Sequence, residues 1–344
     1  MLLLRLILAL PLAGLAVYEG TLTMSGGSGG IAAAGTTNVA PPPPWRPKAG
    51  AAIGPYAAPV QELSVKSRSP RARWTYDWPM KPFNRPHPVR AYLNDPRVAM
   101  FGETHTFHFG VDISARGGTA IYAIEPGTAR LLNKWAVEIK SGDRTLQYWH
   151  IAVAVKNGQR VRRHTQLGRT KMIFNHLHLT EVQAGKYVNP LRPGALGPFA
   201  DRTAPRTTKV TFRRPGSRLD PNAVHGTVDL VADAFDPAAG VTPAPWPVTP
   251  AKLRWRIFKG GKVVAGWHLA VDFRTRVLSP AEFGGIYAPG TRMNHPGWPG
   301  YYCLYLAHGW TSASLPNGNY RLEVEASDIR GNVGISIFPF TVAN

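Results

Sequence analysis

The sequence has little of three things: cysteine, acidic residues and long apolar runs. Its 344 residues include a single cysteine, Cys303, so a scaffold of intrachain disulfides is excluded. Cys303 lies among tyrosines, where we expect a buried small hydrophobic side chain and not a nucleophile. Asp and Glu number 20 against 40 Lys and Arg, which gives a formal net charge of +20 and a pI near 10.4.

This excess of positive charge favours anionic partners such as nucleic acid, anionic membranes or acidic polymers. The basic residues are spread along the chain and no nucleic-acid-binding motif is present, so we expect no nucleic-acid partner. The alternative interpretation is an ordinary basic surface in water, and charge alone assigns no binding.

The apolar run near the N-terminus, Leu6 to Val17, is shorter than the roughly 20 residues that a membrane span needs. It follows Arg5 and contains small residues at Ala13 to Ala16, as the hydrophobic segment of a signal peptide does. We therefore expect residues 1–19 to be a signal peptide, with an uncleaved short anchor as the alternative. No cysteine follows the run, which argues against a lipoprotein anchor, and no stable membrane span is expected after cleavage.

The remaining chain divides by composition. Residues 20–72 are rich in Gly and Pro and lack the apolar content of a folded domain, so they predict a linker. From Trp74 on, short alternating segments separated by Gly and Pro predict an all-β protein, with strands expected at Ala129 to Ile139 and Thr145 to Val155. A polar junction from Asp201 to Lys209 indicates two domains, at 73–200 and 208–344.

What the sequence does contain is three histidine clusters within 71 residues. They are His108-Phe-Gly-Val-Asp112, Tyr148-Trp-His150 and His176-Leu-His178. Alternate residues of a strand share a face, so His176 and His178 are expected on one side, with Leu177 and Leu179 in the core. In a regular strand the even spacing of His108 and Asp112 would again give one face, and Gly110 between them allows a bend or a close backbone approach. Imidazole nitrogen and carboxylate oxygen are zinc ligands, and a catalytic zinc uses three protein ligands and keeps one position open.

A lone histidine is more often a packing or surface residue than a ligand, and a single His-x-His arises by chance. The combination of three clusters in one stretch favours a metal site over coincidence. The other histidines are expected to be ordinary structural residues: His87, His105, His164, His225, His268, His295 and His308.

The stretch from about residue 80 to 191 resembles the lysostaphin-like (LytM-type) zinc endopeptidases of bacterial cell walls. That family carries His-x-x-x-Asp, Tyr-x-His and His-x-His in this order, together with a Gly-Thr-x-x-Tyr-Ala strand that matches Gly118 to Ala123 here. The resemblance implies a β-sheet peptidase domain of the duplicated hybrid motif type. The C-terminal part resembles a bacterial immunoglobulin-like β-sandwich, on the turn signal Asn317-Gly318 and the alternation that follows it.

Carried over, the resemblance makes His108, Asp112 and His178 the ligands of one Zn²⁺ ion. His150 and His176 become the catalytic pair that handles protons. Tyr148 is expected to share a strand face with His150, with either an oxyanion-binding or a packing role. The sequence departs from the family at Arg162 to His164 and at Glu181, which falls one position late; neither touches a ligand.

These expectations favour a secreted or cell-wall-associated zinc metalloendopeptidase that hydrolyses peptide bonds of peptidoglycan. Peptidoglycan peptides are then the expected partner, and anionic wall polymers are candidate partners that fit the basic charge. One alternative is a non-catalytic wall-binding or hydrolase-regulating module of the same fold. The other is a zinc endopeptidase that acts on a protein substrate.

Overall fold

The computed structural model describes residues 75–98, 105–237, 246–294 and 299–344. The predicted signal peptide and linker lie outside the described residues. As predicted, the secondary structure of the described residues is almost entirely β. Within this part of the chain no helix reaches the length and apolar character that a membrane crossing requires. The helices are short: η1 (Pro280–Glu282), α1 (Phe283–Ile286) and η2 (Ser312–Ser314).

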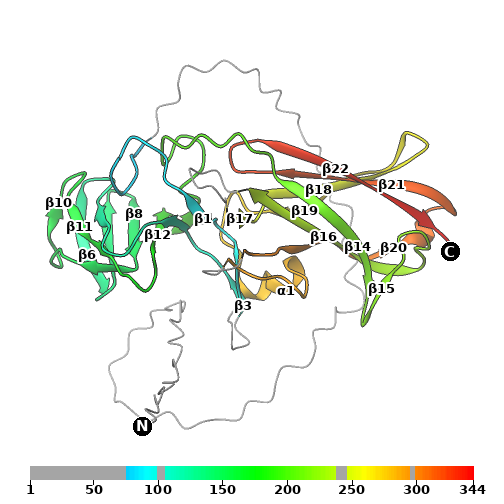
Figure 1. Cartoon of the computed structure of the whole chain (residues 1–344), viewed down its shortest axis with the longest axis horizontal. Helices are drawn as coiled ribbons and strands as arrows, with labels where there is room; N and C mark the ends of the chain where they lie inside the picture. The colour runs from blue at the N-terminus through cyan, green and yellow to red at the C-terminus, as the bar shows by residue number, and fades with distance from the viewer. Residues whose placement is uncertain (1–74, 99–104, 238–245, 295–298) are drawn as a thin grey trace, which may run out of the picture. The chain divides into compact units, whose positions relative to one another are not determined.

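The largest sheet among the described residues contains the His176-Leu-His178 cluster and Asp112 of the first cluster. It has eight strands, in the order β1-β4-β12-β8-β7-β6-β10, with β13 also paired to β12 (Figure 1). All its neighbouring strands are antiparallel. The strands are β1 (Val89–Ala91), β4 (Val111–Ser114), β6 (Gly127–Asn133), β7 (Ala136–Ser141), β8 (Arg144–Trp149), β10 (Arg160–Val161), β12 (His176–Gln183) and β13 (Lys186–Val188).

Two smaller sheets complete this N-terminal lobe, by which we mean the described residues from 75 to 199. One has the order β5-β11-β9 and the other is the hairpin β2-β3. Their strands are β2 (Pro96–Val98), β3 (His105–Phe107), β5 (Ala120–Tyr122), β9 (Ile151–Val153) and β11 (Gln166–Thr170).

The period-two pattern of β12 determines the face on which the site forms. Leu177 and Leu179 are fully buried and belong to one hydrophobic core together with Val111 and Ile113 of β4. The intervening residues of β12 must therefore point to the other face of the sheet. The sequence prediction for His176 and His178 is confirmed in this respect.

Two strand predictions in this lobe were wrong in detail. The segment 129–139 was expected to be one strand, but it contains a hairpin whose turn lies between β6 and β7. The segment 145–155 was also expected to be continuous, but it breaks at His150, whose φ is 67°. In both cases a local turn interrupts an apolar alternation that continues in the sequence on either side.

The C-terminal lobe, residues 206–344, consists of two sheets that share a second hydrophobic core. The first has the order β15-β14-β16-β17 with β20 also paired to β16, and the second has the order β19-β18-β21-β22 (Figure 1). The immunoglobulin-like identity of this lobe stays a prediction. The strands are β14 (Arg206–Arg214), β15 (Ser217–Leu219), β16 (Thr227–Pro237), β17 (Pro247–Val248), β18 (Lys252–Lys259), β19 (Lys262–Asp272), β20 (Cys303–Thr311), β21 (Gly318–Ser327) and β22 (Val333–Val342).

The turn after β1 connects the two lobes through buried polar side chains. The Asn94 amide accepts a hydrogen bond from the Leu278 backbone N–H at 2.9 Å and donates to the Arg276 carbonyl at 2.8 Å. The Asp95 carboxylate accepts from the Thr249 N–H at 2.9 Å. The described residues from 75 onward group as one compact unit, and the predicted domain boundaries at 200 and 208 stay predictions.

Glu181, the residue that departs from the family spacing, is a structural residue in this lobe. Its side chain is fully buried and accepts two hydrogen bonds from Arg192, at 2.6 and 2.7 Å, and one from the Tyr76 hydroxyl. Through these bonds β12 is joined to the first described residues and to the turn that follows β13. A buried carboxylate with this many donors is costly to disrupt, because its partners are left unpaired.

We expect Glu181→Ala to lower the free energy of unfolding by about 3–5 kcal/mol, because Arg192 and Tyr76 lose their buried acceptor. Urea denaturation measures the change. The control is Glu282→Gln, since Glu282 forms an exposed pair with Arg276 and should cost no more than about 1 kcal/mol. Equal losses in both variants would contradict a structural role for Glu181.

Candidate metal centre

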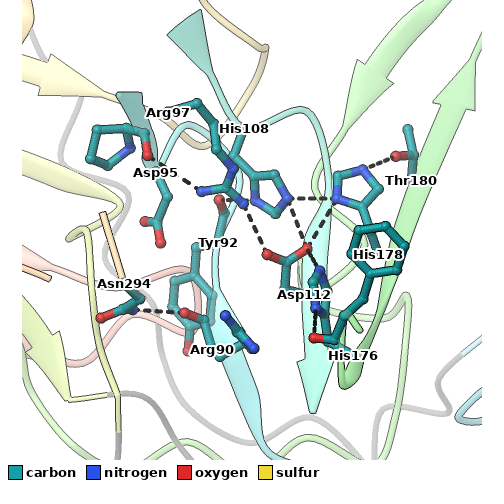
Figure 2. Close-up of polar contacts among 12 residues, drawn as sticks. Arg90, Tyr92, Asp95, Arg97, His108, Asp112, His176, His178, Thr180 and Asn294 are labelled. Carbon is teal, nitrogen blue, oxygen red and sulfur yellow. Dashed lines mark hydrogen bonds and ion pairs between the residues drawn. The ribbon is translucent and has the colours of Figure 1, made fainter. Parts of the chain in front are cut away.

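The three predicted metal ligands lie together in the structure. Asp112 on β4 and His178 on β12 are direct partners across the antiparallel pair. His178 Nδ1 is 3.0 Å from Asp112 Oδ1, and His108 Nε2 is 3.1 Å from the same oxygen. The two imidazole nitrogens are 2.7 Å apart. Figure 2 shows both rings directed toward the Asp112 carboxylate.

His108 reaches this point for a different reason from the one the spacing suggested. It precedes β4 and does not share a strand face with Asp112. The chain between them passes close to β12 at Gly110, where a Cβ would lie 2.4 Å from the Leu179 carbonyl oxygen and 2.8 Å from the Thr180 hydroxyl. Only glycine allows that approach, so the close backbone contact predicted at Gly110 is confirmed.

In each imidazole, the hydrogen bond of the nitrogen that faces away from Asp112 determines whether the other nitrogen carries a proton. His108 Nδ1 is 2.8 Å from the Tyr92 carbonyl, which can only accept, so the Nδ1 carries the proton and Nε2 is bare. His178 Nε2 is 2.9 Å from the Thr180 hydroxyl, which can accept its proton and so leave Nδ1 bare. Two bare nitrogens and a carboxylate oxygen then face one point. This donor set fits a zinc ion, and the outer contacts are those that orient metal-binding histidines.

Arg97 is a neighbour of the site that the sequence analysis did not identify. Its guanidinium lies 2.9 Å from Asp112 Oδ2, the oxygen that does not face the histidines (Figure 2). Burial raises the pKa of Asp112, but His108, His176 and Arg97 outweigh it and hold that pKa well below the usual range. Asp112 is therefore ionised at neutral pH, which is the state that a metal ligand requires. No local pattern around Arg97 in β2 marks it as a partner of the site.

The two predicted catalytic histidines lie side by side next to the ligands. The ring centroids of His150 and His176 are 4.6 Å apart, and His150 also stacks on Phe174 at 4.1 Å. His176 Nδ1 donates to the Phe174 carbonyl at 2.7 Å, so its Nε2 is the basic nitrogen, 3.6 Å from Asp112 Oδ1. Burial lowers the pKa of His176 to about 4, with His150 lowering it further and Asp112 opposing the shift. His176 is thus neutral and able to accept a proton.

Tyr148 does not take part in the site. The left-handed conformation of His150 ends the alternation, so the two side chains do not share a face. Tyr148 is fully buried, and its hydroxyl accepts a hydrogen bond from the Ile124 N–H at 2.9 Å. Of the two roles left open for Tyr148, the structure places it in packing, because the hydroxyl is enclosed in the core.

Thr180 and the aromatic residues around the site were missed by the sequence analysis. Thr180 had a signal, since it continues the period-two pattern of His176 and His178 along β12. The Phe109 ring lies 4.5 Å from that of His178 and contacts Trp149 and Tyr187, at centroid distances of 6.0 and 5.7 Å. Phe174 and Trp135 form a second aromatic pair beside His150. Aromatic rings therefore flank the cluster of predicted ligands and catalytic histidines on two sides.

Comparison with known proteins finds a family match over the segment that contains these residues. Residues 106–190, which contain the three predicted ligands and the two predicted catalytic histidines, match the family model for Peptidase family M23. No curated protein sequence matches the chain.

Solved structures similar to the chain include Csd3 from Helicobacter pylori, with 22% identity, 36% of this chain and 35% of that chain covered and a TM-score of 0.29. A zinc-containing peptidase from Vibrio cholerae has 19% identity, coverage of 32% and 37%, and a TM-score of 0.28. The catalytic domain of the antimicrobial peptidase lysostaphin from Staphylococcus simulans has 20% identity, coverage of 28% and 81%, and a TM-score of 0.25. The chain thus spans about a third of the length of the first two.

Replacing Thr180 by Val should weaken zinc binding about 10-fold or more, because the hydroxyl that fixes the His178 tautomer is lost while the shape is kept. Competition with a chromophoric chelator measures the affinity. Thr211→Val is the matched control, since Thr211 is a buried threonine of β14 whose hydroxyl donates to the Val231 carbonyl, outside the site. If the affinities of both variants equal that of the unmodified protein, Thr180 does not orient His178.

Proposed function

We propose that this chain is a zinc metalloendopeptidase that hydrolyses peptide bonds of bacterial peptidoglycan outside the cytoplasm, on the premise that residues 106–190 form a LytM-type peptidase domain. The observation that carries the proposal is the convergence of His108, Asp112 and His178 with two further histidines beside them. A metal-binding group alone serves structure or catalysis equally well. The adjacent pair of proton-handling side chains favours catalysis.

His108, Asp112 and His178 would hold the zinc ion. When bound, zinc supplies Lewis acidity, which polarises a substrate carbonyl and makes a water molecule acidic enough to react near neutral pH. All three ligands are at most 5% exposed, so they are already ordered and need little rearrangement to bind.

The roles of the other two histidines follow from their contacts. His176 is neutral and its Nε2 is the bare nitrogen, so this nitrogen would be available to accept the proton of the attacking water. His150 lies against His176, and a ring nitrogen of His150 would donate a proton to the amine that leaves. Its backbone is fixed by the hydrogen bond from the Lys171 N–H to the His150 carbonyl, at 2.9 Å.

Two further observations support an extended peptide of a cell wall as substrate. The aromatic rings of Phe109 and Trp149 on one side of the metal group and Phe174 on the other are only partly exposed, which suits contact with a peptide backbone and small side chains. The net charge of +20 suits a substrate embedded among acidic polymers. The non-catalytic alternative is less well supported, because all the ligands and both further histidines are present.

Purified full-length protein should release peptide fragments with new amino termini from isolated cell walls, and a zinc chelator should stop the release. Mass spectrometry of the soluble fragments identifies the bond that is cut. Zinc-loaded protein that releases no wall fragments would contradict the proposal. Cleavage of glycine-rich peptides by that same protein would then favour a protein substrate.

His176→Ala and His150→Ala should keep zinc binding and lower the cleavage rate about 10²- to 10⁴-fold, because proton transfer is lost while the ligands remain. His178→Ala should lose both. The control is His268→Ala, since His268 is an exposed histidine of β19 that stacks on Trp255, and it should cleave at the normal rate. Normal cleavage by His176→Ala would rule out its role as the base.

A further inference from the structure

Three aspartates from separate segments of the chain meet away from the histidine site. Asp201 lies in the connection between the lobes, Asp236 near the end of β16, and Asp328 directly after β21. One carboxylate oxygen from each lies within 4.8 Å of the others. The three residues are 8%, 0% and 2% exposed, respectively. Aspartates are rarely buried without a charged or hydrogen-bonding partner.

Asp236 distinguishes this cluster from an ordinary group of acidic residues, because its buried carboxylate is unpartnered within the described part of the chain. Neither of its carboxylate oxygens has a hydrogen-bond partner among the described residues, although the residue is fully buried. Asp328 differs, because its carboxylate accepts from the backbone N–H groups of Arg330 and Asn332, at 2.8 and 2.9 Å. Asp201 accepts one bond, from the Thr203 N–H at 2.9 Å. The unpartnered oxygens of Asp236 thus face two anchored carboxylates.

The nearby arginine does not neutralise Asp236. Arg330 donates to the Leu196 carbonyl at 3.3 Å, and its guanidinium lies over the Phe199 ring at 5.0 Å. Burial raises the pKa of Asp236 well above its usual range, and the charges of Asp201 and Asp328 raise it further. Burial likewise raises the pKa of Asp201 to about 6. As long as no cation is bound, the protein must protonate these groups or bear their repulsion.

We propose that Asp201, Asp236 and Asp328 bind a calcium ion at the junction between the two lobes. The donor set contains oxygen alone, without the nitrogen or sulfur that zinc and other transition metals prefer. Ca²⁺ takes six to eight oxygens in flexible geometry, so backbone carbonyls or waters can complete its shell. Mg²⁺ requires a near-octahedral shell and gives up water reluctantly, which suits a buried irregular cluster less well.

The position of the cluster indicates what the ion would do. Asp236 belongs to the first sheet of the C-terminal lobe and Asp328 to the turn between two strands of the second, while Asp201 belongs to the connecting segment. One ion would therefore crosslink the two sheets of the C-terminal lobe and the segment that connects the lobes. This inference is independent of peptidase activity.

The test is a titration of metal-free full-length protein with Ca²⁺ at neutral pH. Calorimetry should show one tightly bound ion for each chain. Thermal denaturation at a hundred times the dissociation constant should show a rise in Tm of about 5 °C or more. Asp236→Asn should abolish both responses. His178→Ala should keep both, which separates this site from the zinc site.

Asp229→Asn is the matched control, because Asp229 lies on the same strand, half-buried, and accepts a hydrogen bond from the Gly309 N–H. It should respond to Ca²⁺ normally. Should Asp236→Asn fail to fold, Asp201→Asn provides the same test. The proposal is overturned if the unmodified protein shows no heat and no rise in Tm, or if Asp236→Asn responds as strongly. An equal response to Mg²⁺ would overturn the assignment to calcium.

Discussion

The N-terminal lobe must hold three electron-pair donors close together, all directed at one point. His108 Nε2, His178 Nδ1 and Asp112 Oδ1 lie 2.7–3.1 Å from one another, and such donors repel unless a positive charge lies between them. The fold opposes this repulsion with apolar burial directly behind the site. Leu177 and Leu179 alternate with the histidines on β12 and are fully buried, and each such burial contributes about 1.5–3 kcal/mol. The alternation along β12 therefore directs the histidines toward the site and also anchors the strand through its buried leucines.

That alternation explains why the sequence predicted part of the site so directly. A period of two assigns His176 and His178 to one face whatever the rest of the fold does, and Thr180 follows by the same rule. Arg97 could not be predicted in this way, because it reaches Asp112 through the pairing of β2 with β3, which no local pattern specifies. The convergence of His108 depends on the missing side chain of Gly110 and not on any periodicity.

The failed strand predictions have two causes: the 129–139 hairpin turns beside Asn133, whose side chain accepts from the Trp135 N–H, and the 145–155 segment changes direction at His150. His150 has a φ of 67°, a left-handed conformation that is uncommon for residues other than glycine and that costs of order 1–3 kcal/mol. Stacking on Phe174 and the hydrogen bond to the His150 carbonyl offset that strain. The strained conformation directs the ring toward His176 and away from the buried Tyr148. A pattern that treats every residue as equally extended cannot show this.

Tyr92 links the histidine site to the aspartate cluster. Its carbonyl is the acceptor that fixes the His108 tautomer, and its side chain is fully enclosed, with a pKa raised well above its usual range by burial and by the charges of Asp236, Asp201 and Asp328. A carbonyl moves with its own residue, so the packing of the Tyr92 ring beside the aspartates also determines where the acceptor of His108 lies. Because this raised pKa keeps the Tyr92 hydroxyl neutral, the ring packs beside the aspartates without charge repulsion. The position of the Tyr92 ring beside the aspartates therefore helps to determine the position of the carbonyl that accepts from His108.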